Sequence, residues 1–369
     1  MSVEGGIMMK LGISVYPGHS DWKRDAEYIE MAASYGCSHV FTCLLSVQGG
    51  RDDIIKSFGN RINLAHRCGM EVVLDTAPSV FGALGASYDD LSFFKELGAD
   101  GIRLDECFDS HKEAMMTYNP QGLNIEINAG FGDRYAQNIM SHHPKKGRLS
   151  ACFNFYPQRY TGIGYAHFEK CCHDMRAAGL PVAVFINSQQ PDTFGPWPVN
   201  DGMCTLEMHR DLPADVAARH IWASGLADTV IFANCYASEE EFRCVTAADP
   251  AVLSFRVEEE VPLSGTERKI LYEAAHFVRG DMSEYMARST QPRIEYASGS
   301  ISPRNTRDME PGDVVILNDE YTRYKGELHV VLKKMPNDGR KNVVGHIPEN
   351  ERMLLTYLQP WRTFGFIKD

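Results

Sequence analysis

The stretch Gly98–Asp105, which reads GADGIRLD, shows how this chain is built. It comes directly after a helix-like segment, Ser87–Leu97, whose apolar residues recur at helical spacing. Gly98 stands where helices commonly end in a left-handed residue. Gly101–Asp105 then alternates apolar and polar side chains, which is the pattern of a β-strand. A helix, a glycine stop and a short strand therefore follow one another here.

The same unit recurs along the chain. Glycines stand at the matching helix-to-strand junctions Gly36, Gly69, Gly98, Gly179 and Gly225. Eight short runs rich in β-branched and aromatic residues read as the strands: Leu11–Tyr16, His39–Leu44, Glu71–Thr76, Gly101–Asp105, Asn124–Asn128, Ala151–Tyr156, Val182–Asn187 and Thr229–Asn234. Such alternation indicates parallel βα units, and eight of them predict a closed (β/α)₈ TIM barrel of the α/β class. A doubly wound open sheet is the alternative, although no G-x-G-x-x-G follows a strand.

Beyond about residue 236 the pattern changes. Ser238–Arg243 and Thr266–Phe277 look helical, and from there onward short strands alternate with turn signals. The expected strands are Arg293–Ala297, Val314–Asn318, Leu328–Lys333, Asn342–Ile347 and Met353–Leu358. We therefore predict a barrel domain over residues 1–245, a connecting helical segment over 246–290, and a small, mostly antiparallel, barrel-like all-β domain over 291–369.

The composition limits the function classes. The chain has 369 residues, a formal net charge of −12 and ten cysteines. The acidic balance argues against nonspecific binding to nucleic acid or to an anionic membrane. The cysteines show no C-x-x-C and no zinc-type spacing with histidine, so we expect free thiols in a reducing compartment. Neither a signal peptide nor an apolar run of about 18 residues is found, which makes the cytoplasm the default location. The sequence leaves the oligomeric state open.

The catalytic candidates come from strand parity. In a (β/α)₈ barrel the active site lies at the C-terminal ends of the strands. Side-chain alternation points Asp75, Asp105 and Glu126 into this mouth from three adjacent strands, with Arg103 beside them. Carboxylates so close cannot all ionise freely, so one pKa should rise toward neutrality, as glycoside cleavage requires. The alternative is that these groups fill polar barrel layers, with Arg103 and Glu126 as a buried ion pair.

Amide and phenol side chains are expected around these acids. They are Tyr16, Asn128, Asn154, Tyr156, Asn187 and Asn234. Such groups suit sugar hydroxyls and an acetamido group. Glu106 follows Asp105 directly, and some hexosaminidases place an Asp-Glu pair here with the glutamate donating a proton. Glu106 is therefore a further catalytic candidate, with a solvated loop residue as the alternative.

The loop after the seventh strand, Ser188–Leu212, is long, and long loops on the catalytic face usually carry function. Glu207, His209 and Arg210 in this loop are candidate substrate contacts, and charge at the start of a helix is the other interpretation. A Schiff-base aldolase is disfavoured because no strand offers an inward lysine. A metal-dependent sugar-phosphate isomerase or epimerase stays open, since the three acids are hard oxygen ligands. A non-catalytic sugar-phosphate-binding regulator also stays open.

Several motifs, taken in order, resemble one bacterial family. They are Leu11–Pro17, Phe41–Ser46, Gly98–Asp105, Asn154–Pro157, Thr205–Glu207 and Tyr324–Leu328. This set resembles the 6-phospho-N-acetylmuramidase family over nearly the whole chain. The resemblance implies a barrel followed by a small β-barrel domain. We expect neither a cofactor nor a bound metal. The resemblance further implies cytoplasmic cleavage of N-acetylmuramic acid 6-phosphate–N-acetylglucosamine, a cell-wall turnover product that a phosphotransferase system imports and phosphorylates.

The resemblance also bears on individual residues. The family pattern on the fourth strand is Arg-Leu-Asp followed by a variable position, which weakens the case for Glu106 as general acid. A phosphorylated amino-sugar substrate needs cations, and guanidinium groups bind phosphate through two hydrogen bonds. Arg304, Arg323 and Lys325 of the second domain, with Arg210 of the barrel, are the candidate phosphate anchors. Solvated surface charge is the alternative for each.

Overall fold

The computed structural model describes residues 9–47 and 50–368. The chain divides into two units. The first contains the described residues up to Ile221 together with Gly225–Thr246, and the second contains Trp222–Ser224 and the described residues from Ala247. Each unit is built around its own sheets.

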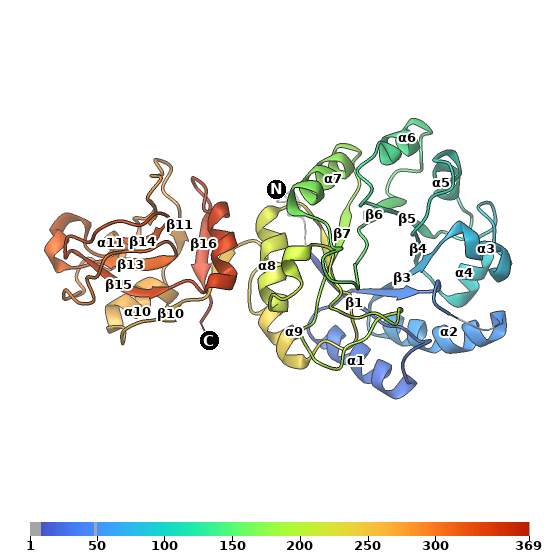
Figure 1. The fold of residues 1–369 in the computed structure, drawn as a ribbon, viewed down its shortest axis with the longest axis horizontal. Helices are drawn as coiled ribbons and strands as arrows, with labels where there is room; N and C mark the ends of the chain where they lie inside the picture. Colours follow the sequence, from blue (N-terminus) through green and yellow to red (C-terminus); the bar gives the residue numbers. More distant parts are fainter. Residues whose placement is uncertain (1–8, 48–49, 369) are drawn as a thin grey trace, which may run out of the picture. The chain divides into compact units, whose positions relative to one another are not determined.

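The first unit is a closed barrel of eight parallel strands in the order β1 to β8, which confirms the predicted TIM barrel. The strands are β1 Lys10–Ser14, β2 His39–Cys43, β3 Glu71–Thr76, β4 Gly101–Leu104, β5 Asn124–Asn128, β6 Leu149–Cys152, β7 Val182–Ile186 and β8 Thr229–Phe232. Figure 1 shows the helices as an outer ring around these strands. Strand β6 begins two residues before its predicted start and ends at Cys152, so Asn154 and Tyr156 lie in the loop that follows it.

The helical segments of this unit are α1 Trp22–Ser34, α2 Arg51–Arg67, α3 Pro78–Leu84, α4 Ser92–Leu97, α5 His111–Met116, α6 Tyr135–Ser141, α7 Tyr165–Ala177, the 3₁₀ turn η1 Glu207–His209, α8 Ala214–Ser224 and α9 Glu239–Thr246. The glycine stops act as expected. Gly98 closes α4 at φ +99°, and a β-carbon there would come within 3.0 Å of Ile62, so the close approach of α2 also requires glycine. This packing fixes where β4 begins.

An aromatic and aliphatic cluster fills the barrel toward the C-terminal ends of the strands. Phe41 and Phe185 are buried in it, and Leu45 and Phe155 are partly buried against it. The rings of Phe41, Phe155 and Phe185 meet edge to face, with centroids 5.0 to 6.1 Å apart. Such edge-to-face contacts give a rigid apolar layer just below the mouth.

The second unit contains a five-stranded sheet in the order β10-β15-β13-β14-β12 and a three-stranded sheet β11-β16-β9. All the strand pairings in these two sheets are antiparallel except that of β16 with β9. This confirms the prediction of mostly antiparallel strands. The segments are β9 Leu253–Phe255, β10 Glu258–Glu259, α10 Gly265–Tyr272, β11 His276–Phe277, β12 Met286–Ser289, α11 Pro292–Glu295, β13 Asp313–Leu317, η2 Asp319–Tyr324, β14 Leu328–Val331, β15 Lys341–His346, η3 Glu349–Tyr357 and β16 Thr363–Phe366.

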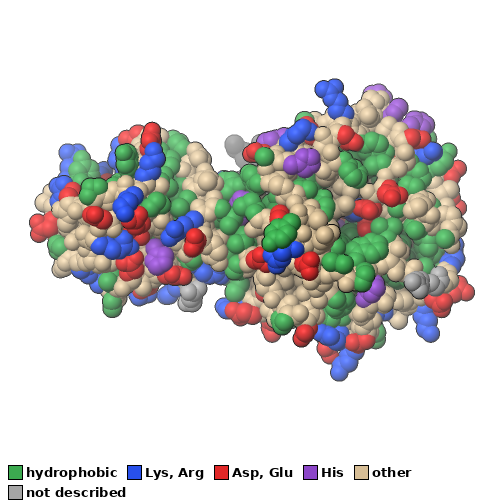
Figure 2. Space-filling model, viewed as in Figure 1, with side chains coloured by type: hydrophobic (Ala, Val, Ile, Leu, Met, Phe, Trp, Pro, Cys, Tyr) green, Lys and Arg blue, Asp and Glu red, His purple; other side chains and the backbone are tan. Residues whose placement is uncertain are grey.

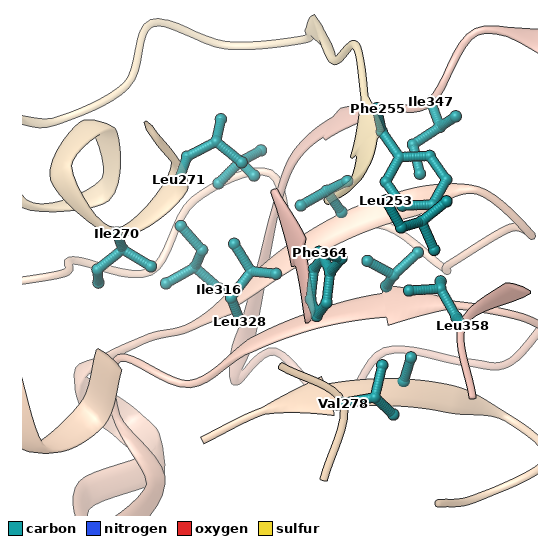
Figure 3. Close-up of a cluster of buried hydrophobic side chains, with 14 of the residues drawn as sticks. Leu253, Phe255, Ile270, Leu271, Val278, Ile316, Leu328, Ile347, Leu358 and Phe364 are labelled. Carbon is teal, nitrogen blue, oxygen red and sulfur yellow. The ribbon is translucent and has the colours of Figure 1, made fainter. Parts of the chain in front are cut away.

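One apolar core joins the two sheets of this unit. Ile316 and Leu328 from the larger sheet pack with Phe255 and Phe364 from the smaller one, and Ile270 of α10 closes the cluster (Figure 3). Burial of these side chains drives the folding of the unit.

Three expectations for this region were wrong. The segment 246–290 is not a connecting helical segment, because it supplies β9 to β12 to the two sheets. The expected strand Arg293–Ala297 is the helix α11, whose first residue, Pro292, has a backbone angle suited to a helix start. The expected strand Met353–Leu358 falls largely in the 3₁₀ segment η3. A short apolar run does not by itself distinguish a strand from a buried helical turn.

On the face drawn in Figure 2, acidic and basic side chains are interspersed over both units. Among the described residues, no helix has the length and apolar character needed to cross a bilayer.

Candidate active site

Two carboxylates meet one guanidinium at the C-terminal mouth of the barrel. Asp75 Oδ1 lies 2.5 Å from Arg103 Nη1, and Asp105 Oδ1 lies 3.3 Å from the same nitrogen. Asp75 and Arg103 are buried, whereas the Asp105 side chain keeps 31% of its surface exposed. The arrangement therefore has an inner acid, an outer acid and a cation between them.

The strand register creates this cluster. Asp75 of β3 and Arg103 of β4 are direct partners across the two strands. Asp105 comes two residues after Arg103, so its side chain returns to the same face at the end of the strand. The apolar neighbours Leu74 and Leu104 are buried on the opposite face, toward the helices. Parity thus predicted the inward direction of these three residues correctly.

Two asparagines extend the cluster. Arg103 Nη2 donates to Asn154 Oδ1, and Asn128 Nδ2 donates to the same oxygen at 3.1 Å. Asn128 also donates to the backbone oxygen of Asp105 at 3.3 Å. Each amide is held by its neighbour, so the polar groups stand in fixed positions before any ligand arrives. Preorganisation of this kind is what an active site needs.

The acids line a cavity of about 80 Å³. Its polar side consists of Asp75, Arg103, Asp105 and Asn154. Its apolar side consists of Phe41, Leu45, Phe155, Phe185 and Trp197. Trp197 lies in the long loop after β7, and its 41% exposure at this position makes it a site residue that sequence reasoning missed. The exposed tryptophan on a long βα loop was the available signal.

Burial raises the pKa of Asp75 to about 6, and the negative charge of Asp105 adds to the rise, while the Arg103 charge opposes it. Burial also raises the pKa of the half-buried Tyr156 phenol. A carboxyl group that holds its proton toward neutral pH, next to an exposed second carboxylate, can serve as a general acid.

Glu126 does not join the other two acids. Glu126 of β5 is the register partner of Arg103, and it accepts from Ser150 Oγ at 3.1 Å. It lines a larger cavity, of about 560 Å³, formed by the first residues of the strands at the opposite end of the barrel. Arg103 pairs with Asp75 and Asp105, and no ion pair between Arg103 and Glu126 is found among the described residues. The expectation of three acids in one pocket therefore reduces to a pair.

The loop candidates Glu207 and Arg210 hold the backbone in place. Both Glu207 oxygens accept from Arg210, and they also accept from the backbone N–H groups of Tyr160 and Gly162 at 2.7 and 2.8 Å. Hydrogen bonds from Arg210 lower the pKa of Glu207 to about 2, against the effect of its partial burial. Arg210 donates in addition to the backbone oxygens of Tyr156 and Gly202. This network, which we call the loop clamp (Glu207, Arg210, Tyr160 N–H and Gly162 N–H), joins the β6–α7 loop to the β7–α8 loop.

Most of the remaining candidate residues of the barrel are buried and form hydrogen bonds with other parts of the protein. Buried His209 contacts His220 at 2.7 Å, and burial lowers the pKa of His209 well below its usual value. The Tyr16 hydroxyl donates to the Ala233 backbone oxygen at 2.5 Å. Asn187 bonds the backbone of Met203 and Arg210, and Asn234 bonds that of Ser188. Glu106 is exposed and lies outside the residues that line the mouth cavity.

Two of the proposed phosphate anchors already have partners within the second unit. Arg304 contacts Glu267 and the Pro262 backbone oxygen. Lys325 donates to the Gly299 oxygen at 2.9 Å and lies 3.5 Å from Asp319. Arg323 is exposed. Of the three, Arg323 is therefore the side chain most open to an anion.

An oxygen-ligated metal ion fits this mouth poorly. Arg103 occupies the space between Asp75 and Asp105, where a divalent cation bridging the two carboxylates would have to bind. Among residues 9–47 and 50–368, no group of three or more His, Cys, Asp or Glu side chains is placed to hold a metal.

A carboxylate pair at the mouth of a (β/α)₈ barrel is the machinery of a glycosidase, and comparison with known families agrees. The model described as "6-phospho-N-acetylmuramidase, N-terminal" matches residues 11–247, and the model described as "6-phospho-N-acetylmuramidase, C-terminal" matches residues 253–367. The chain belongs to the 6-phospho-N-acetylmuramidase family, as the sequence motifs indicated.

Two solved structures are similar over the whole chain. An uncharacterized B. cereus protein is 46% identical, with a TM-score of 0.90, and the match covers 98% of this chain and 99% of that one. A conserved Enterococcus faecalis protein of unknown function is 25% identical, with a TM-score of 0.73, and the match covers 98% and 96%. The search of curated proteins gave no match.

Proposed function

We propose that this protein hydrolyses N-acetylmuramic acid 6-phosphate–N-acetylglucosamine at the glycosidic bond, in the cytoplasm, as a step of cell-wall recycling. The observation that carries the proposal is the pair Asp75 and Asp105, held by Arg103 at the mouth of a barrel whose chain belongs to the 6-phospho-N-acetylmuramidase family. Asn128, Asn154 and Tyr156 supply hydrogen-bonding groups for sugar hydroxyls beside these acids.

The two acids take different roles in this proposal. Asp75, with its raised pKa, holds a proton and delivers it to the bridging oxygen as the bond from that oxygen to the anomeric carbon breaks. Asp105, the more exposed acid, faces the positive charge that develops at the anomeric carbon and bonds to that carbon as the leaving sugar departs. A water then displaces Asp105 from the anomeric carbon: its hydroxyl ends on that carbon, its proton passes to Asp75, and Asp105 is released as the carboxylate.

The spacing of the acids favours retention of configuration. Asp75 Oδ1 and Asp105 Oδ1 contact the same Arg103 nitrogen at 2.5 and 3.3 Å, so these two oxygens lie closer than the sum of those distances. That limit is below the roughly 6.5 Å at which inverting enzymes begin to leave room for a water between their acids. NMR of freshly released product tests this: we expect the anomer of the substrate first, and initial release of the other anomer would contradict it.

The substrate assignment is tested with a matched pair of disaccharides. The purified protein is incubated with the 6-phosphorylated disaccharide and with the same disaccharide lacking phosphate, and the release of N-acetylglucosamine is measured. We expect turnover of the phosphorylated form and far slower turnover of the other. Equal turnover of both would remove the phosphate from the proposal, and turnover of neither would remove the activity.

A metal-dependent isomerase is the main rival on this fold. Loss of activity after dialysis against EDTA, with recovery on adding a divalent metal, would favour it. The position of Arg103 between the two acids favours hydrolysis instead.

A further inference from the structure

We propose that the mouth cavity is a specificity pocket for the N-acyl group of the sugar that is cleaved, with Phe155 and Leu45 setting its size. This inference rests on the proposed function and names the substrate group that enters beside Asp75 and Asp105. The cavity walls, their charge and their size each point to this group.

The cavity is small. Its volume is about 80 Å³. A single water needs roughly 10–15 Å³ by the same kind of measure, and pockets for whole drug-sized ligands span about 300–1,000 Å³. The cavity therefore takes a substituent of a few heavy atoms and not a sugar ring. The ring itself lies above it, on the solvent side, where Trp197 is exposed.

One wall is apolar and stiff. Phe41, Phe155 and Phe185 form it through mutual edge-to-face contacts, and Leu45 completes it. Phe41 and Phe185 are buried. Phe155 and Leu45 are only partly buried, so they are the members of this wall that solvent reaches. A polar group placed against this wall would lose its hydration without compensation, whereas a methyl group gains from burial there.

The facing wall is polar but not cationic. Arg103 carries one positive charge, and the two aspartates that contact it, Asp75 and Asp105, offset that charge. The Arg103 hydrogen bonds go to Asp75, Asp105, Asn154 and the Cys152 backbone oxygen. Neither the phosphate nor the lactyl carboxylate of the proposed substrate is attracted to such a wall.

An acetamido group satisfies both walls. Its methyl group faces the aromatic rings, and its N–H donates to a carboxylate of the opposite wall. The substrate's two anionic groups are thereby directed out of this cavity. The pocket consequently selects the length of the N-acyl chain, because its aromatic wall cannot move aside without disturbing the packed barrel interior.

The test measures ratios of kcat/KM for substrates that differ only at the nitrogen of the phosphorylated sugar. The series contains the N-acetyl form, the N-propionyl form and the free amine. With the unaltered enzyme we expect the N-acetyl form to exceed each of the others by about 10–200-fold, the discrimination typical of one misfitted group in a tight pocket. Equal kcat/KM for all three overturns the inference while the proposed function stands.

A size-change variant sharpens the test. Phe155→Ala enlarges the cavity, so we expect the N-propionyl to N-acetyl ratio to rise at least about tenfold over the unaltered enzyme. Phe131→Ala, in an exposed loop outside the cavity, is the matched control and leaves that ratio unchanged. Because the readout is a ratio, a general loss of activity does not affect it. Leu45→Ala is the second variant if Phe155→Ala does not fold, and an unchanged ratio in a folded variant overturns the inference.

Failure of the proposed function gives a different result. If the unaltered protein cleaves none of the disaccharides, calorimetric binding of N-acetylmuramic acid 6-phosphate and of its free-amine form still tests the pocket. Tighter binding of the acetylated sugar, lost in Phe155→Ala, supports it. Equal binding of the two sugars overturns it.

Discussion

The substitution Asp105→Asn tests the proposed mechanism most directly. It replaces the carboxyl group by an amide of nearly the same shape. If Asp105 stabilises the charge that develops on the sugar, kcat should fall by at least about 10²–10³-fold, the usual cost of removing one positioned charge-stabilising group. KM should change far less, because the lost interaction is strongest in the transition state.

The structure predicts that stability is affected much less than rate. Asp105 keeps 31% of its side-chain surface exposed, and its contact with Arg103 is 3.3 Å long. Because Asp105 is partly exposed and its contact with the buried Arg103 is long, losing this contact should cost only about 0–1 kcal/mol of the free energy of unfolding. Asp75 remains beside Arg103 at 2.5 Å, so the guanidinium keeps a buried counter-charge in the variant. A large loss of kcat with a small change of melting temperature is therefore expected.

The assay follows release of N-acetylglucosamine under saturating and sub-saturating substrate, with thermal unfolding measured on the same preparations. Glu106→Gln is the matched control, because Glu106 is the adjacent acid, is exposed, and lies outside the mouth cavity. It should keep nearly all the activity. The reasoning fails if folded Asp105→Asn keeps kcat within about tenfold of the unaltered enzyme, since the loss would then lie below the range for a positioned charge-stabilising group.

Three other predictions concern residues around this pair. The raised pKa of Asp75 predicts that kcat falls as the pH rises through about 6, because the proton donor is lost. The contribution of Asp75 to the free energy of unfolding should likewise fall as the pH rises from its unfolded pKa near 3.8 through about 6. A kcat that still rises above pH 7 would contradict the assignment of the acid. Gly162→Ala places a β-carbon 2.6 Å from Glu207 Oε2 and 2.8 Å from the Glu207 backbone nitrogen. This clash should lower the free energy of unfolding by about 1–3 kcal/mol and disorder the loop clamp. An unchanged melting temperature would show that the clamp adjusts freely. Glu126→Gln should leave kcat close to that of the unaltered enzyme, because Glu126 lines the cavity at the far end of the barrel; a loss as large as that of Asp105→Asn would place it back in the mechanism.

The barrel could be predicted from sequence because its signals are local and repeated. Each unit carries its own helix period, glycine stop and strand alternation, so an error in one unit does not change the architecture. The second unit lacks such repetition. Pro292 before the short run Arg293–Ala297 is a helix-start signal that outweighs the strand-like composition of that run, and the apolar run Met353–Leu358 has no clear period.

The sequence predicted the direction in which the site residues point, but not their position along the barrel axis. Strand parity gives the direction of a side chain, which is why Asp75, Arg103 and Asp105 were predicted to point inward. Parity does not give the level along the barrel axis, and Glu126 points inward at a level that belongs to the other end. Nor does sequence reveal which polar groups are already used: Glu207 and Arg210 look like substrate contacts until their mutual hydrogen bonds are seen.

Arg103 explains why this carboxylate pair can function. Two carboxylates this close repel each other, and the cost of that repulsion is high in a buried site without a counter-charge. The guanidinium touches both acids, but Asp75 is buried and Asp105 is partly exposed. Burial favours the proton on Asp75 although the Arg103 charge opposes it, so the buried acid is the proton donor and the exposed acid faces the sugar. Both residues are aspartates, so it is their difference in exposure that distinguishes the proton donor from the acid that faces the sugar.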